Sequence, residues 1–164
     1  MKITVRRAVP SDRIGIMPLQ KEIADIHHDG RPDLFRTEAR YYSEDDFQAK
    51  LTHPDHRIFI AEADGEVAGY VFAMVKRARN HPTYVDFDQF YIDDICVAEQ
   101  YRRNGIATAL FERCTEQARA DDCYNIELNV FCFNEDAIAF YEAMGMKKMI
   151  HRMELIVDEK EEQQ

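Results

Sequence analysis

The sequence of 164 residues predicts a mixed α/β fold, with a mostly antiparallel sheet of six to seven strands and about four helices. Three observations predict it. Asp64-Gly65 lies between two apolar runs, which is typical of a β-hairpin. After Gly105, apolar residues recur at four-residue spacing, as in a helix with one buried face. Strand-like alternation precedes and follows this helix, so the two flanking strands should be roughly parallel.

The composition is that of one globular domain, with 46% hydrophobic and 32% charged residues. We expect this domain over residues 1–157 and a charged, solvated tail over 158–164. The net charge of −10 argues against affinity for nucleic acid or anionic membranes and suits a cationic substrate, although acidity also serves solubility alone.

The compartment is expected to be cytoplasmic, because no apolar run approaches transmembrane length and the first residues lack the apolar core of a signal peptide. The cysteines form no C-x-x-C pair, so we expect reduced, mostly buried thiols and no metal site. The oligomeric state stays open, with a homodimer as one option. The four cysteines are Cys96, Cys114, Cys123 and Cys132.

A short alternating strand opens the chain and ends before Pro10. Ser11 and Asp12 offer N-caps for a helix that reaches Ile26 and that Pro18 kinks or divides. The turn-forming residues 27–35 then predict a loop, with a lid as one role. Paired histidines there do not predict a metal site, because neighbouring side chains diverge and no third ligand follows.

Ser43 and Asp46 form a capping-box pattern that begins a short helix, which ends at residues 53–54. The hairpin strands follow, over residues 57–63 and 66–75. A long strand over residues 84–97 comes next.

The end of that strand leads into a tight turn and a helix over residues 106–120. Arg102, Arg103 and Gly105 lie at this turn, and the first acid of the helix is Glu112. Because the first turn of a helix attracts anions, a helix that lacks its own acid there suits an external phosphate. The alternative is an ordinary strand-to-helix turn in which Gly105 supplies the bend.

Residues 125–131 alternate strictly and predict another strand. Asn134 then caps a further helix that carries its own acids, and Gly145 ends it. Residues 148–157 alternate again and predict a last strand.

Asp93 and Asp94 are adjacent acids in the long strand. Consecutive strand residues point to opposite faces, so a regular strand directs one of the pair into a cleft, unless a bulge displaces the other. The sequence does not choose between them. Asp86 and Asp88 add negative charge or form a solvated edge, and Cys96 is expected to be a small core residue.

Two motifs in this order resemble the GNAT family of acetyl-CoA-dependent N-acetyltransferases. The family's phosphate pattern Q/R-x-x-G-x-G/A is met by Arg102, Gly105 and Ala107, and residues 134–146 resemble its second signature. Residues 103–104 depart from the Gly-Lys of many relatives. The resemblance implies a strongly bent sheet that opens near the cofactor, and acetyl-CoA as cosubstrate without a metal. It implies that the following residues bind coenzyme A: Cys96, Val97, Arg102, Arg103, Asn104, Gly105, Ile106, Ala107, Thr108 and Asn134.

By the same resemblance, the expected function is acetyl transfer to a primary amine by direct attack on the thioester. Asp93 and Asp94 are candidate bases or ammonium anchors, and Tyr141 is the candidate acid for the thiolate, although it could be core. The acidic strand resembles that of diamine and polyamine acetyltransferases, so a small amine or polyamine is the expected substrate. The alternatives are a peptide or protein N-terminal or lysine acetyltransferase, or a non-catalytic acyl-CoA-binding regulatory module.

Overall fold

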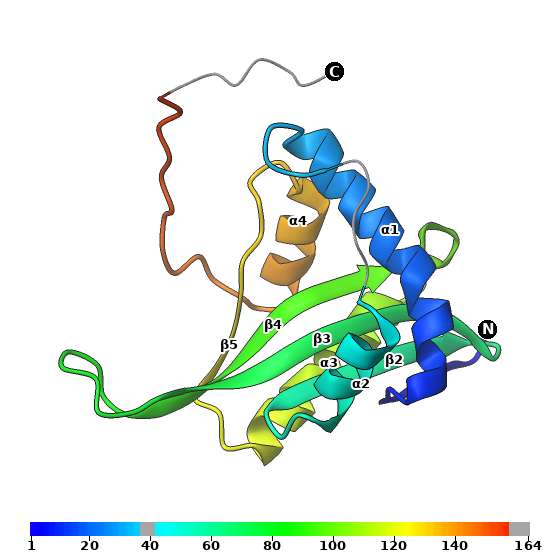
Figure 1. The fold of residues 1–164 in the computed structure, drawn as a ribbon, viewed down its shortest axis with the longest axis horizontal. Coiled ribbons are helices and arrows are strands. Elements are labelled where there is room, and N and C mark those ends of the chain that lie inside the picture. The colour runs from blue at the N-terminus through cyan, green and yellow to red at the C-terminus, as the bar shows by residue number, and fades with distance from the viewer. Residues whose placement is uncertain (37–41, 158–164) are drawn as a thin grey trace. The chain divides into compact units, whose positions relative to one another are not determined.

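A computed structural model describes residues 1–36 and 42–157. The chain divides into two compact units, one made of Met1–Ile23 with Arg40–Asn129 and the other of Ala24–Ala39 with Val130–Gln164. Two short 3-10 turns, Pro10–Asp12 and Glu99–Tyr101, join longer elements (Figure 1). Those elements are β1 (Ile3–Arg7), α1 (Arg13–Gly30), α2 (Glu44–Thr52), β2 (His56–Ala63), β3 (Glu66–Ala78), β4 (Phe87–Val97), α3 (Ile106–Ala120), β5 (Asn125–Leu128) and α4 (Glu135–Ala143).

The five strands form one sheet in the order β1-β2-β3-β4-β5. The first three neighbouring pairs are antiparallel, and β4 pairs with β5 in parallel, as expected of strands that a helix connects. The mixed α/β class and the mostly antiparallel sheet are therefore confirmed. The expected six to seven strands were too many for the part of the chain that the structure describes.

The strand predicted over residues 148–157 accounts for this difference. The segment has no regular structure, and its large apolar side chains are exposed, from 59% at Ile156 to 86% at Met153. Alternation marks a chain that can form a strand, but a strand needs backbone partners from a neighbour. The described sheet contains no strand from this segment, and its last strand is β5, which is four residues long.

The hairpin between β2 and β3 is confirmed. Ala63 pairs with Glu66, and the two residues between them have positive φ angles, 51° at Asp64 and 94° at Gly65. A type I′ turn requires positive φ at both central positions, which Asp-Gly tolerates. The capping box at α2 is also present, since Ser43 Oγ accepts from Asp46 N at 3.1 Å.

Helix α1 is longer than predicted. It passes through Pro18 as one helix and continues to Gly30, so the predicted loop over residues 27–35 was wrong in its first part. The two histidines lie in the last turn of the helix, and burial lowers the pKa of His27. The backbone N–H of Arg31 donates to His27 O at 2.9 Å.

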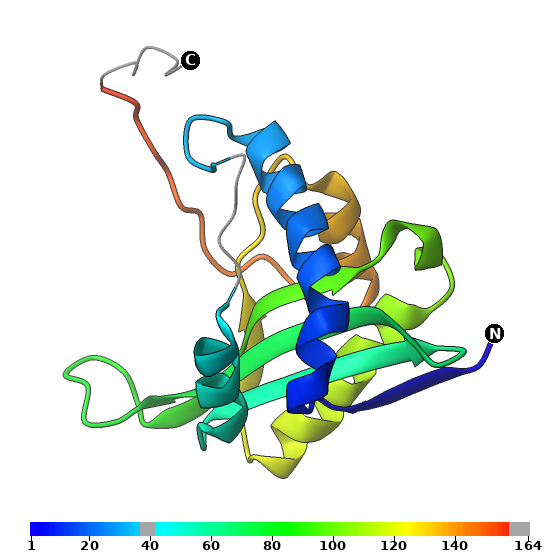
Figure 2. The same cartoon turned by 45° about the vertical axis from the view of Figure 1, so that its right-hand side comes forward.

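Two helices cover opposite faces of the sheet in the first unit, α2 on one and α3 on the other (Figures 1 and 2). Phe47 of α2 belongs to a buried cluster with Tyr70 and Phe72 of β3, which Ile16 and Leu19 of α1 complete. The opposite face packs α3 through Ile106, Leu110, Cys114 and Ala118, all buried as the four-residue spacing predicted. Within the described residues, no helix is long and apolar enough to cross a membrane.

Candidate active site

A β-bulge interrupts β4 at the two adjacent acids. Opposite them on β3, Phe72 pairs with Asp94, but the next residue, Ala73, pairs with Ile92. Asp93 is the extra residue and pairs with neither. An extra residue shifts the alternation of a strand by one, so residues on either side of it change faces.

Because of the bulge, residues that would share one face of β4 point to opposite faces of the sheet before and after Asp93. Ile92 lies opposite Ala73, on the α3 side of the sheet, whereas Asp94 lies opposite Phe72, in the cluster covered by α1 and α2. In a regular strand, residues 92 and 94 would share one face. The bulge thus places a carboxylate among apolar side chains and leaves Asp93 exposed. The structure thus distinguishes the two acids by their exposure.

Asp94 has a neutral hydrogen-bond partner. The hydroxyl of Tyr70, a residue with no exposed surface, donates to Asp94 Oδ2. Burial raises the pKa of Asp94 to about 6; the Tyr70 bond lowers it, and the charge of Asp93 raises it. Burial and Asp94 in turn hold the pKa of Tyr70 far above its usual range, so this phenol stays protonated. Asp94 can therefore change its protonation state near neutral pH.

Cys96 is part of the same cluster and is not a nucleophile. Its thiol is buried and donates to Leu19 O at 3.4 Å. Burial raises the pKa of Cys96 to about 12, so the thiolate is not formed at neutral pH. The expectation of a small core residue is met, and all four cysteines are free.

The edge of β4 beyond the bulge is open toward β5. The ladder between these strands covers four pairs and ends at Ile92 and Leu128. Past that point, β4 pairs with β3 through to Val97, and the described sheet has no strand on its other side. Unpaired backbone groups on such an edge can bond an extended ligand. Val97 O already accepts from Arg102 Nε at 3.1 Å, which leaves one lone pair of this carbonyl.

The turn before α3 has the geometry of an anion cradle. Arg103 has φ 62° and Gly105, the N-cap of α3, has φ 82°. No side chain in the described structure caps this helix, and its first turn contains no acid. Asn104 Nδ2 braces the turn by donating to the carbonyls of Tyr101 and Arg102, at 3.2 and 2.9 Å. Backbone N–H groups and the helix dipole thus remain for an external anion.

Gly69 lets α3 approach the sheet at this point. A Cβ atom there would lie 2.9 Å from Cys96 O and 3.2 Å from the side chains of Ile106 and Leu110. Gly69 pairs with Val97, the last residue of β4. The close approach places the start of α3 beside the end of β4.

Arg102 does not point freely into solvent. Its guanidinium lies 3.3 Å from Glu22 Oε2, and the same carboxylate oxygen accepts from Glu99 N at 3.0 Å. Glu22 therefore ties the first half of α1 to the turn. We did not identify this residue from the sequence, where it reads as one of many helical acids.

The second unit contains the two remaining candidates. Asn134 caps α4, since its Oδ1 accepts from Ala137 N at 3.3 Å, so its amide NH₂ is what it can offer a ligand. Tyr141 is partly buried on the same helix, with its ring centroid 5.4 Å from that of Phe140. The structure does not relate these residues to the carboxylates of the first unit.

Two further acids, Asp88 in β4 and Asp86 just before it, have partners of their own. Asp88 pairs with Arg79 at 2.5 Å, and Asp86 accepts from Asn80 N at 2.9 Å. They lie at the opposite end of the strand from the bulge. In the described ranges, no group of three or more histidine, cysteine, aspartate or glutamate residues could hold a metal ion.

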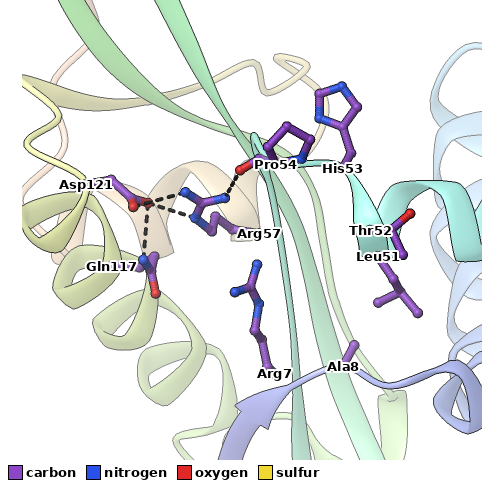
Figure 3. A pocket seen from close by; sticks show the side chains of 9 residues that line it. All are labelled: Arg7, Ala8, Leu51, Thr52, His53, Pro54, Arg57, Gln117 and Asp121. Atoms are coloured by element: carbon purple, nitrogen blue, oxygen red, sulfur yellow. Dashed lines mark hydrogen bonds and ion pairs between the residues drawn. The ribbon is translucent and has the colours of Figure 1, made fainter.

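A polar pocket lies at the other end of α3 (Figure 3). Its charges are largely matched: Arg57 binds both carboxylate oxygens of Asp121, at 2.8 and 3.0 Å, and donates to Pro54 O at 2.7 Å. Gln117 also donates to Asp121. This pocket is distinct from the residues around Gly105 and Asp94.

The residues present fit a coenzyme A thioester on two observations. The uncapped start of α3 suits a pyrophosphate, and the open edge of β4 suits an extended arm with amide groups. Tyr70 was not predicted as a site residue, because the sequence does not show that its hydroxyl meets Asp94, which lies on the neighbouring strand.

The sequence is similar to those of known proteins. The sequence matches the model of the Acetyltransferase (GNAT) family over residues 21–146. It is 34% identical over 110 residues to an N-alpha-acetyltransferase of Sulfurisphaera tokodaii, which covers 63% of this chain and 64% of that protein. It is 35% identical over 97 residues to an L-ornithine N5-acetyltransferase of Arabidopsis thaliana, which covers 58% of this chain and 41% of that protein. The matches span less than two thirds of either relative.

A solved structure has the same fold. The tetramutant of the BH1408 protein from Bacillus halodurans superposes with a TM-score of 0.89 at 27% identity, over 94% of this chain and 99% of that chain. The family match includes α2, the whole sheet beyond β1, the bulge, the turn at Gly105 and α4. This chain therefore belongs to the GNAT family of acetyltransferases.

Proposed function

We propose that the protein transfers an acetyl group from acetyl-CoA to a primary amine of a small molecule, with a polyamine or similar diamine as the preferred acceptor. One observation carries the proposal: Asp94 is a partly buried carboxylate next to a bulge, held by a neutral phenol, with its pKa raised to about 6. Such a group is mostly ionised at pH 7 and is basic enough to accept a proton from a bound ammonium, directly or through a water.

Acetyl-CoA supplies the acetyl group as an activated thioester. The backbone of residues 102–108 would hold its pyrophosphate at the uncapped start of α3. Cys96 and Val97 would offer main-chain groups on the open edge of β4, and the amide NH₂ of Asn134 would donate to the pyrophosphate or to the arm beside it. The roles of Val97 and Asn134 match what these two residues have available for hydrogen bonding.

Asp93 would anchor the ammonium group of the acceptor. It is exposed, and its charge acts on Asp94, on Tyr91 and on Tyr42. A diamine carries a second cationic group, which an acidic neighbour of the base can bind while the first amine reacts. The ornithine-specific name of one relative agrees with an acceptor of this kind.

Tyr141 would return a proton to the departing thiolate. A phenol with a pKa of about 10 is protonated at neutral pH and can donate its proton to the thiolate as it forms. The test is Tyr141→Phe: we expect kcat to fall by about 10²-fold or more, the lower end of a general-acid contribution. An unchanged rate across the pH range would remove this role.

The decisive experiment mixes the protein with acetyl-CoA and a panel of diamines, polyamines, amino acids, aminoglycosides and peptides, and follows thiol release. We expect turnover with diamines or polyamines above that with monoamines of equal length. Turnover with peptides alone would overturn the small-amine proposal. Absence of turnover together with tight acetyl-CoA binding would instead favour a regulatory acyl-CoA-binding module.

A second candidate is acetylation of peptide or protein N-termini. The observation that favours it is the 34% identity to an N-alpha-acetyltransferase over 110 residues. An α-amino group has a pKa near 8, so a base with a pKa of about 6 would deprotonate it more easily than a polyamine nitrogen. Peptides with free and blocked N-termini, but the same lysines, separate this activity from lysine acetylation.

A further inference from the structure

Tyr70 is buried for a reason that packing alone does not explain. Its ring has no exposed surface and lies among Ile60, Phe72 and Cys96. A phenylalanine would fill the same space without placing a hydroxyl in an apolar cluster. A buried hydroxyl costs free energy unless it forms a hydrogen bond, and here it donates to Asp94 Oδ2.

The ring that carries this hydroxyl is held in place. Tyr70 pairs with Cys96 across the sheet, and its ring meets that of Phe72 edge to face, with centroids 5.4 Å apart and planes at 82°. Phe72 in turn pairs with Asp94. The donor therefore has little freedom to follow the carboxylate, so the hydrogen bond restrains the carboxylate rather than the ring.

The neighbours of Asp94 supply no positive charge in the described structure. The groups that change its pKa are the Tyr70 hydroxyl, the backbone N–H of Ile95 and the carboxylate of Asp93. Tyr42, just before α2, and Cys96 also face Asp94, and both are neutral at pH 7 because burial and nearby carboxylates raise their pKa values. A neutral donor orients a carboxylate and partly offsets burial without suppressing its affinity for a proton.

We propose that Tyr70 is a positioning residue for the catalytic base, with its hydroxyl holding Asp94 in the orientation and the ionised form that proton abstraction needs. The inference rests on the proposed acetyl transfer and assigns Tyr70 a role in it that does not require contact with the amine or with acetyl-CoA. Its counterpart, the bulge at Asp93, turns the Asp94 backbone toward the cluster, and Tyr70 then fixes the side chain.

The test is Tyr70→Phe, which deletes one oxygen and keeps the ring. Without its donor, Asp94 becomes harder to ionise, so we expect the acidic limb of the pH profile of kcat/KM to move upward by about one pH unit. At pH 7 the smaller ionised fraction of Asp94 should lower the rate about twofold, and the rate should recover above pH 8. The KM for acetyl-CoA should stay within about twofold, because Tyr70 touches no part of the anion cradle.

Tyr42→Phe is the matched control. Tyr42 packs against the same cluster, with its ring centroid 5.4 Å from that of Phe72. Loss of its hydroxyl should leave the acidic limb within about 0.3 pH units of the wild type, because at neutral pH this phenol is uncharged. An equal shift of the acidic limb in both variants would show that either hydroxyl affects the ionisation of Asp94, and would overturn a specific role of Tyr70.

A readout without turnover separates this inference from the proposed function. Titration of the Asp94 carboxyl by ¹³C NMR should give a higher pKa in Tyr70→Phe than in the wild type. If that shift appears but no amine is acetylated, the contact stands and the proposed function fails. If amines are acetylated while both the NMR pKa and the acidic limb stay unchanged, Tyr70 is structural and the inference is wrong.

Discussion

Two aspartates on the same strand have opposite surroundings. Asp88, near the start of β4, pairs with Arg79 at 2.5 Å and lies 3.7 Å from Arg77, its cross-strand neighbour. Asp94, past the bulge, receives a hydrogen bond from neutral Tyr70. A nearby cation favours the charged form of a carboxylate, whereas burial without a cation favours the neutral form. The first arrangement makes an acid structural, and the second leaves it able to exchange a proton.

The difference arises from what each acid meets across the sheet. Arg77 of β3 lies opposite Asp88, but Phe72 lies opposite Asp94 because the bulge has shifted the register. An acid opposite a long cation is neutralised at the surface. An acid that the bulge turns into an apolar cluster loses solvation and gains reactivity. Three aspartate-to-asparagine changes on this one strand can test the contrast, since each keeps the size of the side chain.

The largest effect is expected from Asp94→Asn. An amide cannot accept the proton of an ammonium substrate, so kcat should fall by about 10²- to 10⁴-fold, the usual contribution of a general base. The measurement is steady-state acetyl transfer by thiol release, at pH 7 and at pH 9. Recovery at pH 9, where more of the amine is already neutral, would support a role in deprotonation. A loss of less than about threefold at pH 7 would contradict it.

The same variant should be more stable than the wild type above pH 6. The pKa of Asp94 is raised from 3.8 to about 6 on folding, so the folded protein binds the proton more tightly and loses stability as pH rises through this window. We expect Asp94→Asn to raise the free energy of unfolding by about 1–3 kcal/mol at pH 8.

Urea unfolding at pH 4, 6 and 8 measures this difference. The gain of the variant should shrink toward zero at pH 4, where the carboxyl is protonated in the folded chain and about half protonated in the unfolded chain. A variant that is less stable than the wild type at pH 8 would show that the charged carboxylate is stabilising, as expected of Asp88 and not of Asp94.

Asp93→Asn should act on binding. Its carboxylate is exposed, so its attraction for a cationic acceptor is worth about 0.2–1 kcal/mol, and the KM for a diamine should rise about two- to fivefold. Monoamine kinetics are the control, since a monoamine has no second cation to anchor. An equal rise for both acceptors would assign Asp93 a role in orienting Asp94 instead.

The smallest effect is expected from Asp88→Asn. Acetyl transfer should stay within about twofold, because Asp88 lies at the other end of β4, and the free energy of unfolding should fall by about 0.5–1 kcal/mol as the partly exposed arginine pairs are lost. Parallel kinetics and urea unfolding provide the measurement. A loss of activity as large as that of Asp94→Asn would break the contrast between the two ends of the strand.

Local backbone features were predictable from the sequence because they depend on a few neighbouring residues. Asp64-Gly65 has the positive φ angles of its turn, Ser43 and Asp46 form their capping box, and Gly105 begins α3 without an acid in the first turn. Each is decided by the conformational freedom of glycine or by a short polar side chain within three residues of its partner.

Features that need a distant partner were not predictable. Residues 148–157 alternate like a strand, yet they have no regular structure and pair with no strand of the described sheet. Helix α1 continues through His27 to Gly30, past the expected loop. In both cases the local sequence pattern favours one conformation and contacts with the rest of the chain decide another. Those contacts cannot be read from the segment's own sequence.

The acidic strand shows the same division within the candidate site. The sequence alone determined that two adjacent acids precede a Gly-containing turn, and it predicted that only one of them can face a cleft while the other points away or is displaced by a bulge. Tertiary structure decided which acid is the less exposed, because the register against β3 makes Asp93 the extra residue and sets Asp94 opposite Phe72 and beside Tyr70. Strand register depends on hydrogen bonds and packing across the whole sheet, so the proton affinity of one carboxylate is a property of the assembled fold.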